Sequence, residues 1–257
     1  MTLSALGYAW YARRLRNRLD PALVPRHVGL IMDGNRRWAR QMGMGNPSLG
    51  HRYGAEHTEN VLTWCERAGV RNVTVFVCST ENLRRRDSDE VDFLMRVIEQ
   101  VVADRLGRPT SRWRVQIAGM LDALPDSTAR ALKDAVEATR ECATGARVTL
   151  AVGYGGRQEI VESLRDLLYE RAAGGADLRR VAETLTENDI ARHLYTDGLP
   201  DPELVIRTSG EQRLSNFLLW QSVRSELHFC DAYWPAFREV DFLRALRGFQ
   251  RRRTRNP

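Results

Sequence analysis

Short apolar runs alternate with longer segments of helical periodicity along most of the chain. The runs cover 28–32, 72–78, 113–118, 147–152 and 203–207. Each is too short for a core helix but suits a buried strand. Helical spacing of apolar residues predicts helices over about 53–68, 89–106, 126–142, 158–173 and 187–194. This alternation predicts an α/β fold with a mostly parallel sheet of about six strands, flanked by helices.

The 257 residues fit one large α/β domain, and no linker rich in Pro, Gly or Ser divides them. We therefore expect a single domain over 1–257, with a helical extension over 1–24 and a core over 25–250. Residues 4–19 have the pattern of a basic amphipathic helix, which could pack on the domain, cover the apolar end of a ligand or rest on a membrane surface. No stretch approaches the ~20 apolar residues of a membrane span.

Basic residues outnumber acidic ones, with 39 Lys and Arg against 33 Asp and Glu, and arginines cluster at 84–86 and 251–253. The surplus predicts a negatively charged partner, whether nucleic acid, anionic lipid or phosphorylated metabolite. The four cysteines are scattered, without a C-x-x-C pair or a histidine at zinc-site spacing. We expect reduced thiols in a cytoplasmic protein.

A first polar cluster follows the strand predicted at 28–32. Asp33 comes directly after this strand, at the carboxyl end where open α/β sheets bind ligands. Gly34 lets backbone approach a ligand closely, and Arg36 and Arg37 suit a polyanion that carries a divalent cation. The alternative is an ordinary strand-to-helix turn with Asp33 as its cap. The combination favours an anion and metal site.

A second polar cluster lies within 207–226. Arg207 ends a predicted strand, and Arg213 and Ser215 follow on the next loop, so that two guanidinium groups and a hydroxyl could hold a second anion. Glu226, just before another apolar run, could reach a metal ion at that anion. The common glycine-rich nucleotide motifs are missing. Two anion sites with apolar strands between them suggest two phosphorylated substrates with apolar bodies, as in an isoprenoid diphosphate condensation.

Four motifs carry a resemblance to a known family. They are HVGLIMDGNRRWAR, VFVCSTENL, AVGYGGR and LVIRTSGEQRLSNFLLWQ with the following SELHF, and the match runs from His27 to about Leu246. The chain resembles the cis-prenyltransferases, the undecaprenyl diphosphate synthase family, and most of all their short-chain Z-isoprenyl members from actinobacteria. The resemblance implies a homodimeric, Mg²⁺-dependent enzyme that joins isopentenyl diphosphate to geranyl or dimethylallyl diphosphate.

By this resemblance, the first cluster binds the allylic diphosphate. Asp33 is the implied Mg²⁺ ligand that helps this diphosphate depart, because an allylic carbon–oxygen bond ionises when the departing charge is neutralised. The groups implied to hold the leaving diphosphate are Gly34, Asn35, Arg36, Arg37, Trp38 and His51. For isopentenyl diphosphate, the resemblance implies Arg207, Arg213, Leu214 and Ser215, with Glu226 completing its Mg²⁺ site.

A polar loop predicted at 79–87 borders the reacting carbons by the same resemblance. Asn82 is implied in proton removal. A neutral amide is a poor base, so we expect Asn82 to position the substrate while the diphosphate or a water accepts the proton. The other residues implied in this loop are Ser79, Thr80, Glu81, Leu83 and Arg85.

Departures from the family pattern bear on the product. Pro47 stands where the family has an arginine, Leu83 where a tryptophan is common and Gln212 where a histidine is common. The tail also lacks the common Phe-Gly-Gly ending. Val77 occupies a position that is small in long-chain members, and Phe76 lies beside it. A wider wall obstructs a growing chain, so we predict a product of about three isoprene units, or about C15.

Other functions stay open. Pro47 and the altered tail are compatible with an irregular, lavandulyl-type prenyltransferase that joins two allylic diphosphates, and a longer-chain polyprenyl diphosphate synthase is a second alternative. A noncatalytic subunit of the same fold would not need Asp33, Asn82, Arg213 and Glu226 together. We expect no nucleic-acid partner, because the arginine clusters lack the interleaved aromatic platform that single strands require.

Overall fold

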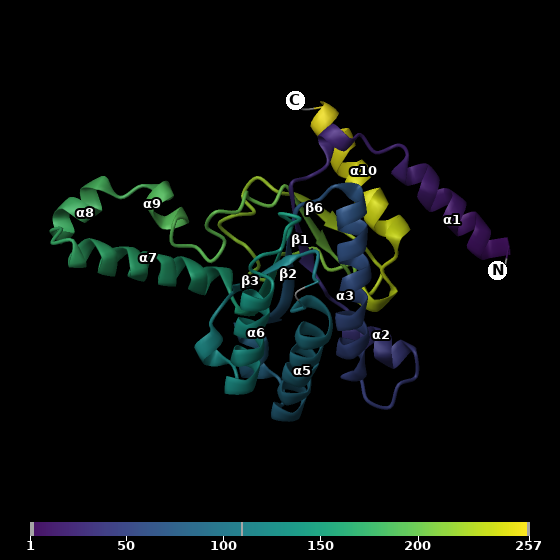
Figure 1. The fold of residues 1–257 in the computed structure, drawn as a ribbon, viewed down its shortest axis with the longest axis horizontal. Helices are drawn as coiled ribbons and strands as arrows, with labels where there is room; N and C mark the ends of the chain where they lie inside the picture. The colour runs from purple at the N-terminus through teal and green to yellow at the C-terminus, as the bar shows by residue number, and fades with distance from the viewer. Residues whose placement is uncertain (1–2, 109, 256–257) are drawn as a thin grey trace.

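Six strands form one parallel sheet in the computed structural model, which describes residues 3–108 and 110–255 (Figure 1). They are β1 (His27–Ile31), β2 (Asn72–Ser79), β3 (Arg114–Ala118), β4 (Arg147–Tyr154), β5 (Leu204–Arg207) and β6 (Glu226–Phe229). Their order is β3-β4-β2-β1-β5-β6, and each neighbouring pair is parallel. The predicted α/β class and parallel sheet are confirmed. Met1, Thr2, Asn256 and Pro257, which belong to the predicted extension and tail, lie outside the described residues.

Most predicted helices are present with shifted ends. The helices of the described chain are α1 (Leu3–Arg16), α2 (Asn35–Gln41), α3 (Leu49–Ala68), α4 (Thr80–Arg85), α5 (Ser88–Val101), α6 (Asp126–Ala138), α7 (Gly156–Ala173), α8 (Leu178–Thr184), α9 (Glu187–Ala191) and α10 (Glu239–Arg255). A π-helical turn over Val102–Leu106 continues α5. The segment expected as a polar loop at 79–87 instead contains α4, because Ser79 accepts a hydrogen bond from the N–H of Asn82 and caps the helix.

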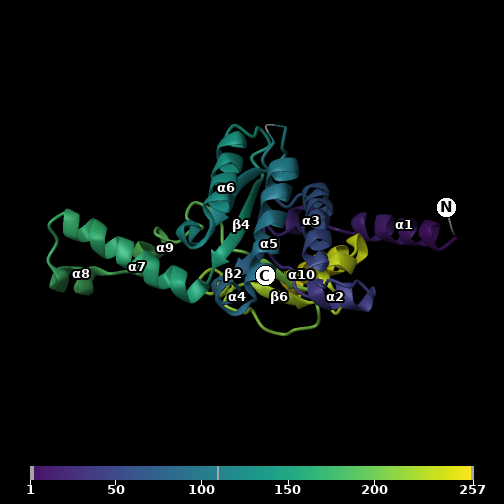
Figure 2. The same cartoon turned by 90° about the horizontal axis from the view of Figure 1, so that it is seen from below.

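The main core lies between one face of the sheet and helices α3, α5 and α6, which stand side by side in Figure 2. Leu62 of α3, Ile98 of α5 and Leu132 of α6 pack there against strand residues such as Val75. A smaller cluster on the other face contains Tyr154, Val205, Phe217 and Leu218. The last two come from the loop after β5, so the packing of this face fixes the position of that loop.

Two parts of the chain extend away from the sheet in opposite directions, α1 on one side and α7–α9 on the other (Figures 1 and 2). Ala12 and Leu15 of α1 pack against Val240 and Leu243 of α10, so packing on the domain, the first alternative for this helix, accounts for one of its faces. Within the described residues, no helix is long and apolar enough to cross a membrane.

The centre of the sheet is a topological switch point. After β1 the chain turns toward β2, whereas after β5 it turns the opposite way, toward β6. β1 and β5 are neighbours, with Ile31 beside Arg207 at their carboxyl ends. In open α/β sheets such a divergence leaves a crevice where ligands bind. The residues that follow β1 and β5 are therefore the first place to look for a site.

Candidate active site

Asp33 and Arg207 meet at this switch point. Arg207 Nη2 donates a hydrogen bond to Asp33 Oδ2 over 2.7 Å, and Arg37 Nη2 donates to Asp33 Oδ1 over 3.2 Å. The backbone N–H of Asp33 donates to Thr208 Oγ1 over 3.0 Å, which fixes the backbone position from which the carboxylate extends. Burial raises the pKa of Asp33, but the hydrogen bond and charge of Arg207 outweigh it, so the pKa lies below its usual value. Asp33 is thus an ionised, partly exposed carboxylate between two guanidinium groups.

Gly34, rather than Asp33, is the N-cap of α2. Its φ of 97° is in the left-handed region, and a Cβ there would lie 2.5 Å from Tyr233 Cδ1. The alternative reading of Asp33 as an ordinary helix cap is therefore wrong. Asn35 is half-buried at the contact of α2 with α3, where a Cβ on Gly50 would lie 2.1 Å from the Asn35 carbonyl oxygen. The glycines hold α2 close to the end of β1, with Arg36 and Arg37 on its first turn.

His51 and Arg36 belong to a cluster centred on Glu90. Arg36 Nη1 lies 3.0 Å from Glu90 Oε2, and Arg86 Nη1 lies 3.0 Å from Glu90 Oε1. His51 Nε2 is 3.2 Å from Arg86 Nη1 and 3.4 Å from Glu90 Oε1. Burial, and then the charge of Arg86, lower the pKa of His51 to about 4. Neither Glu90 nor Arg86 was predicted as a site residue from the sequence; Arg85, which was predicted, is exposed.

Other residues implied for the first site pack around it. Trp38 lies against Tyr53, with ring centroids 5.2 Å apart. Thr80 borders the turn after β4, where a Cβ on Gly155 would lie 2.9 Å from Thr80 Oγ1. Glu81 Oε1 accepts a hydrogen bond from Asn216 Nδ2 over 2.9 Å, which ties α4 to the loop after β5. Leu83 packs against the main core, and Asn82 is half-buried one residue earlier.

The loop from Arg207 to Leu218 has an unusual backbone. Within the described chain, the non-glycine residues with positive φ are Ser209 (79°), Ser215 (49°), Asn216 (65°) and Leu218 (44°). Such conformations cost free energy and persist only when their surroundings hold them, often at functional sites. Here Arg207 supplies part of that restraint, because its Nη1 donates to Ser215 Oγ over 2.6 Å and to the Arg213 carbonyl oxygen over 2.5 Å.

The structure separates the residues implied for the second anion. Arg207 is 4% exposed and directed at Asp33, whereas the Arg213 side chain is 63% exposed and paired with Glu211. Leu214 packs beside the smaller core cluster. Arg207 therefore links the two polar clusters, which were predicted as two separate anion sites.

Glu226 lies apart from both clusters within one chain. It begins β6 beside Leu204, whereas Phe229, three residues later, is level with Arg207. A strand rises about 3.3 Å per residue, so Glu226 is roughly 10 Å from Arg207 along the sheet, toward the amino ends. Its carboxylate is paired with Arg252 of α10. The expectation that Glu226 reaches a metal ion near Arg207 is not met within this chain.

An apolar cavity of about 40 Å³ opens from the end of β1 into the main core. Met32, the residue before Asp33, lines it together with Val77, Ile98 and the π-helical residue Val102. Phe76 does not line this cavity, contrary to its expected role beside Val77. Alternate residues of a strand face opposite sides, and the Phe76 ring stacks on Phe217 on the other face, with centroids 4.9 Å apart.

A divalent cation at this site would need oxygen ligands from a substrate. No group of three or more His, Cys, Asp or Glu side chains suited to a metal occurs among the described residues. Asp33 offers one ionised, 29% exposed carboxylate beside two guanidinium groups. Mg²⁺ in proteins is commonly held by one or two carboxylates, waters and substrate phosphates. The donor set at Asp33 fits that mode of binding.

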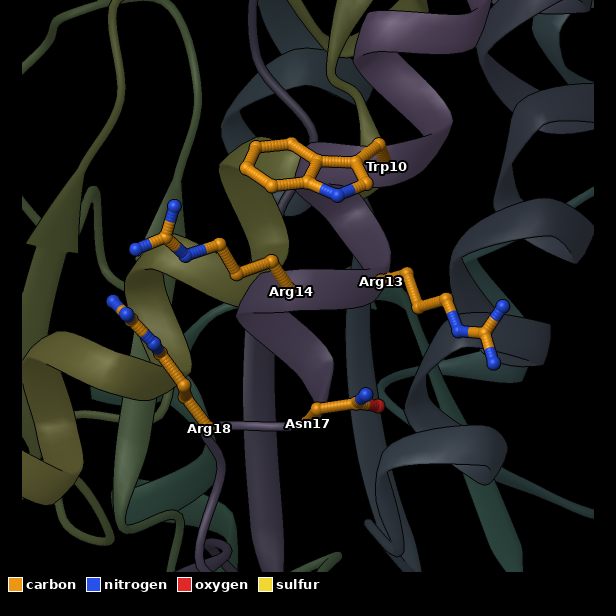
Figure 3. Close-up of a pocket in the computed structure, with 5 residues that line it drawn as sticks. All are labelled: Trp10, Arg13, Arg14, Asn17 and Arg18. Carbon is orange, nitrogen blue, oxygen red and sulfur yellow. The ribbon is translucent and has the colours of Figure 1, made fainter.

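A second feature, far from the sheet, is a shallow hollow on α1 lined by Trp10, Arg13, Arg14, Asn17 and Arg18. Figure 3 shows Arg14 and Arg18 extending to one side of the helix below the Trp10 ring, whereas Arg13 points to the other. The guanidinium of Arg14 lies 5.3 Å from the centre of this ring, and Trp10 is 61% exposed. α1 therefore presents an aromatic and strongly basic surface.

Comparisons with known proteins point to one family. The family model described as putative undecaprenyl diphosphate synthase matches residues 31–256. An isoprenyl transferase of Streptomyces fradiae is 67% identical over 99% of both chains, and a (2Z,6E)-farnesyl diphosphate synthase of Thermobifida fusca is 52% identical over 96% of both. Among solved structures, lavandulyl diphosphate synthase from Lavandula x intermedia in complex with dimethylallyl diphosphate has a TM-score of 0.80 and 33% identity, covering 89% of this chain and 96% of that one.

Proposed function

Because the chain belongs to the undecaprenyl diphosphate synthase family of prenyltransferases, we propose that it joins isopentenyl diphosphate to geranyl or dimethylallyl diphosphate and releases a Z-prenyl diphosphate of about C15. One observation carries this proposal: the ionised Asp33 lies between Arg207 and Arg37, directly after Met32, which lines an apolar cavity. This arrangement suits a substrate with a charged head and an apolar body. The names of relatives about half identical, such as the Thermobifida farnesyl diphosphate synthase, support the same product class.

In the proposed reaction, Asp33, Arg36 and Arg37 surround the departing diphosphate of the allylic substrate. Enzymes of this family use a divalent metal; we propose Mg²⁺ bound to Asp33, where it would supply the charge neutralisation that lets the carbon–oxygen bond ionise. The guanidinium groups add fixed positive charge at the same place, already oriented by Asp33 and Glu90. Gly34, Asn35, Trp38 and His51 complete the proposed binding site.

Isopentenyl diphosphate would bind on the loop after β5. We assign its diphosphate to Arg213 and Ser215, with Arg207 and Leu214 shaping the loop beneath them. Asn82, on α4, would position the reacting carbons, and a diphosphate oxygen or a water would accept the proton, since a neutral amide is a poor base. The neighbouring residues assigned to substrate positioning are Ser79, Thr80, Glu81, Leu83 and Arg85.

The proposed product length rests on the small cavity beside Asp33. Val77 is part of its wall, so the size of this side chain limits the room for a growing chain. Val77→Ala would remove two methyl groups from the wall and so widen the cavity. We expect this variant to release a larger share of longer products, measured by chromatography of the dephosphorylated alcohols. An unchanged product would show that Val77 does not limit chain length.

A homodimer is the proposed assembly. α7 projects from the sheet (Figure 1), and its exposed apolar side chains Val161, Leu168 and Tyr169 lie at helical spacing on one side. A surface of this kind suits a second copy of the chain. In a dimer we propose that Glu226 exchanges its pairing with Arg252 for a metal site of the other subunit, which would fulfil its predicted role.

Peripheral membrane contact through α1 is a further part of the proposal. Exposed Trp10 beside Arg13, Arg14 and Arg18 is a combination that favours the interface of an anionic bilayer (Figure 3). The four cysteines, Cys65, Cys78, Cys142 and Cys230, are free thiols. The cytoplasmic location predicted from their spacing remains a prediction.

An irregular coupling is the second candidate function. The observation that favours it is the likeness to lavandulyl diphosphate synthase over 89% of this chain. Such an enzyme would join two allylic diphosphates and give a branched product. The relatives with higher identity carry the names of regular synthases, so we place regular coupling first.

Product identification separates these functions. The purified protein is incubated with Mg²⁺, geranyl or dimethylallyl diphosphate as the allylic partner, and either isopentenyl or a second dimethylallyl diphosphate. The alcohols obtained after dephosphorylation are then identified by mass spectrometry and NMR. A linear Z alcohol from isopentenyl diphosphate supports the proposal, whereas a branched alcohol supports irregular coupling. No turnover with any pair would indicate a noncatalytic subunit.

A further inference from the structure

A buried carboxylate that the proposed reaction does not use lies beside the smaller core cluster. Glu159, in the first turn of α7, is 1% exposed, and no ion pair to its side chain occurs within residues 3–108 and 110–255. Burial raises the pKa of Glu159 above its usual value, and hydrogen bonds offset this only in part. Because a buried carboxylate without a cation is costly, its surroundings must supply several hydrogen-bond donors.

Hydrogen bonds from three separate segments converge on this carboxylate. The Tyr154 hydroxyl, at the end of β4, donates to Oε2, and the backbone N–H of Tyr195 donates to Oε1 over 3.0 Å. Gln221 Nε2, from the loop after β5, lies 3.1 Å from Oε1 and 3.2 Å from Oε2. The same nitrogen is 2.9 Å from Thr196 Oγ1, and Gln221 is only 3% exposed. A buried polar network whose carboxylate is satisfied in this way holds its members rigidly.

The carboxylate closes the base of the α7–α9 segment, residues 156–194. This segment leaves the sheet after β4 and returns at Tyr195, 36 positions after Glu159 (Figure 1). Ser163, one turn further along α7, adds a second contact, because its Oγ lies 2.7 Å from the Glu159 carbonyl oxygen and 3.1 Å from that of His193. The two ends of the segment are therefore fixed to each other at the end of β4.

The same carboxylate restrains the loop after β5 through Gln221. Three residues before Gln221 lies Leu218, which is fully buried with a φ of 44°, a conformation that its surroundings must hold. The N–H of Ser222 donates to the Leu218 carbonyl oxygen over 2.8 Å, so a displacement of Gln221 would also displace this strained residue. Ser215, which we assign to isopentenyl diphosphate, lies only three residues before Leu218.

We propose that Glu159 is a positioning residue for the second substrate. Through Gln221 it holds the loop after β5 in the conformation that presents Arg213 and Ser215 to a diphosphate. The inference rests on the proposed function and adds to it a residue that touches no substrate. A carboxylate suits this place because both of its oxygens accept, so all the donors around it can be satisfied at once. An amide in its place would offer Gln221 one oxygen and one NH₂ group, and no orientation of two facing amides pairs both contacts.

The first test compares Glu159→Gln with Glu162→Gln as a matched control. Glu162 lies on the same helix, but its side chain is 30% exposed and pairs with Arg165. A buried donor left unpaired in Glu159→Gln should raise the KM for isopentenyl diphosphate roughly 5- to 20-fold. The KM for geranyl diphosphate should stay within about twofold of the wild type, and Glu162→Gln should behave as the wild type. An unchanged KM for isopentenyl diphosphate overturns the assignment, and so does an equal rise for both substrates.

The second test asks whether the effect passes through Gln221. Adding Gln221→Glu to Glu159→Gln again places one carboxylate opposite one amide, so the KM for isopentenyl diphosphate should fall roughly threefold from that of Glu159→Gln. Gln221→Glu alone brings two buried carboxylates together and should have the lowest melting temperature of the three variants. A double variant whose KM is no lower than that of Glu159→Gln overturns the coupling through Gln221.

Direct binding keeps this inference separate from the proposed function. Calorimetry measures isopentenyl diphosphate with Mg²⁺ and saturating geranyl thiolodiphosphate, whose carbon–sulfur bond resists ionisation, so that no turnover is needed. If the wild type binds isopentenyl diphosphate but forms no linear Z product, regular coupling fails, while weaker binding by Glu159→Gln still supports the inference and equal binding overturns it. If the wild type does not bind isopentenyl diphosphate, both fail.

Tyr154→Phe serves where thermal unfolding shows that Glu159→Gln is unstable. It keeps the carboxylate and removes one of its donors, the Tyr154 hydroxyl. Binding of isopentenyl diphosphate should weaken roughly threefold, with binding of geranyl diphosphate unchanged. Affinity for isopentenyl diphosphate equal to that of the wild type would overturn the positioning role.

Discussion

The two anion-binding regions of the candidate site are built in opposite ways. The first, around Asp33, takes its side chains from the starts of regular helices, and Gly34 supplies the one unusual backbone conformation. The second, from Arg207 to Leu218, is a loop in which four non-glycine residues have positive φ. Helix starts fix side chains with little strain, whereas such a loop must be held by other contacts.

This difference shows which side chains hold the local structure of each region. In the first region the guanidinium groups are paired with carboxylates, Arg37 with Asp33 and Arg36 with Glu90. In the second region Arg213 is largely exposed, and the loop depends on Arg207 and Asn216. The side chains of the first region are already oriented for a ligand, whereas the backbone of the second region is held in place by neighbouring residues. Arg207 is in contact with both regions, so its replacement should affect both, unlike the replacement of the other residues of the site.

Removing Asp33 should break the first region alone and give the largest effect on activity. Asp33→Ala and Asp33→Asn should each lower kcat by roughly 10³-fold or more, because the Mg²⁺ proposed at the departing diphosphate loses its protein ligand. Asp33→Asn should keep a melting temperature close to wild type, because an amide oxygen can still accept from Arg207. Turnover assays and thermal unfolding measure the two effects. Either variant retaining most of its activity would refute the metal role.

Replacing Arg207 should damage both regions together. Arg207→Lys keeps the charge but cannot bond Asp33, Ser215 and the Arg213 carbonyl at once. Losing one or two of these hydrogen bonds at a buried charged group costs on the order of 3 kcal/mol of unfolding free energy. We expect that loss in denaturant titrations, together with a raised KM for both substrates. A rise confined to isopentenyl diphosphate would show that Arg207 belongs to the second region only.

The sequence predicted the sheet better than the site. Apolar runs mark buried strands directly, so β1 to β5 lie where expected, and Asp33 and Arg207 follow them at one edge. α2 and α4 are short and polar, so apolar periodicity could not reveal them. The long-range contacts were equally hidden: the Asp33–Arg207 hydrogen bond joins residues 174 positions apart, and no local pattern encodes it.

Two expectations that this chain does not meet by itself have physical causes of the same kind. Phe76 was expected on the cavity wall because it neighbours Val77, but neighbours in a strand face opposite sides. Glu226 was expected near Arg207 from its place in a motif, yet it begins its strand while Arg207 ends one. Glu90 could have been noticed as the i+4 partner of Arg86, but its contacts with Arg36 and His51 depend on how three helices pack.

Asn216 offers a way to test the strained loop separately. Its side chain accepts from the N–H of Arg157 over 2.9 Å and donates to Glu81, and its φ is 65°. Asn216→Ala should lose about 2 kcal/mol of unfolding free energy, from the lost hydrogen bonds and an alanine in the left-handed region.

Asn216→Gly is the matched control, because glycine tolerates this φ but makes no side-chain hydrogen bonds. It should be more stable than Asn216→Ala by roughly 1 kcal/mol in denaturant titrations. Both variants should raise the KM for isopentenyl diphosphate more than that for the allylic substrate. Equal stability of the two variants would show that the backbone at 216 is not strained.

The smallest expected effect is a pH dependence of stability that arises in the first region, because His51 lies there. Burial and Arg86 lower its pKa from 6.5 to about 4, so between these values the unfolded state binds the proton and the folded state does not. Stability is therefore fully present above pH 6.5 and falls as the pH is lowered toward 4. At pH 5.5 the wild type should lose about 1 kcal/mol from this group relative to pH 7.5. His51→Gln removes this term while other histidines titrate unchanged, so the difference between the two denaturant titrations isolates it. Equal losses in both proteins would mean that His51 is protonated as easily in the folded chain as in the unfolded one, and that the first region is less closed than the ion pairs around Glu90 indicate.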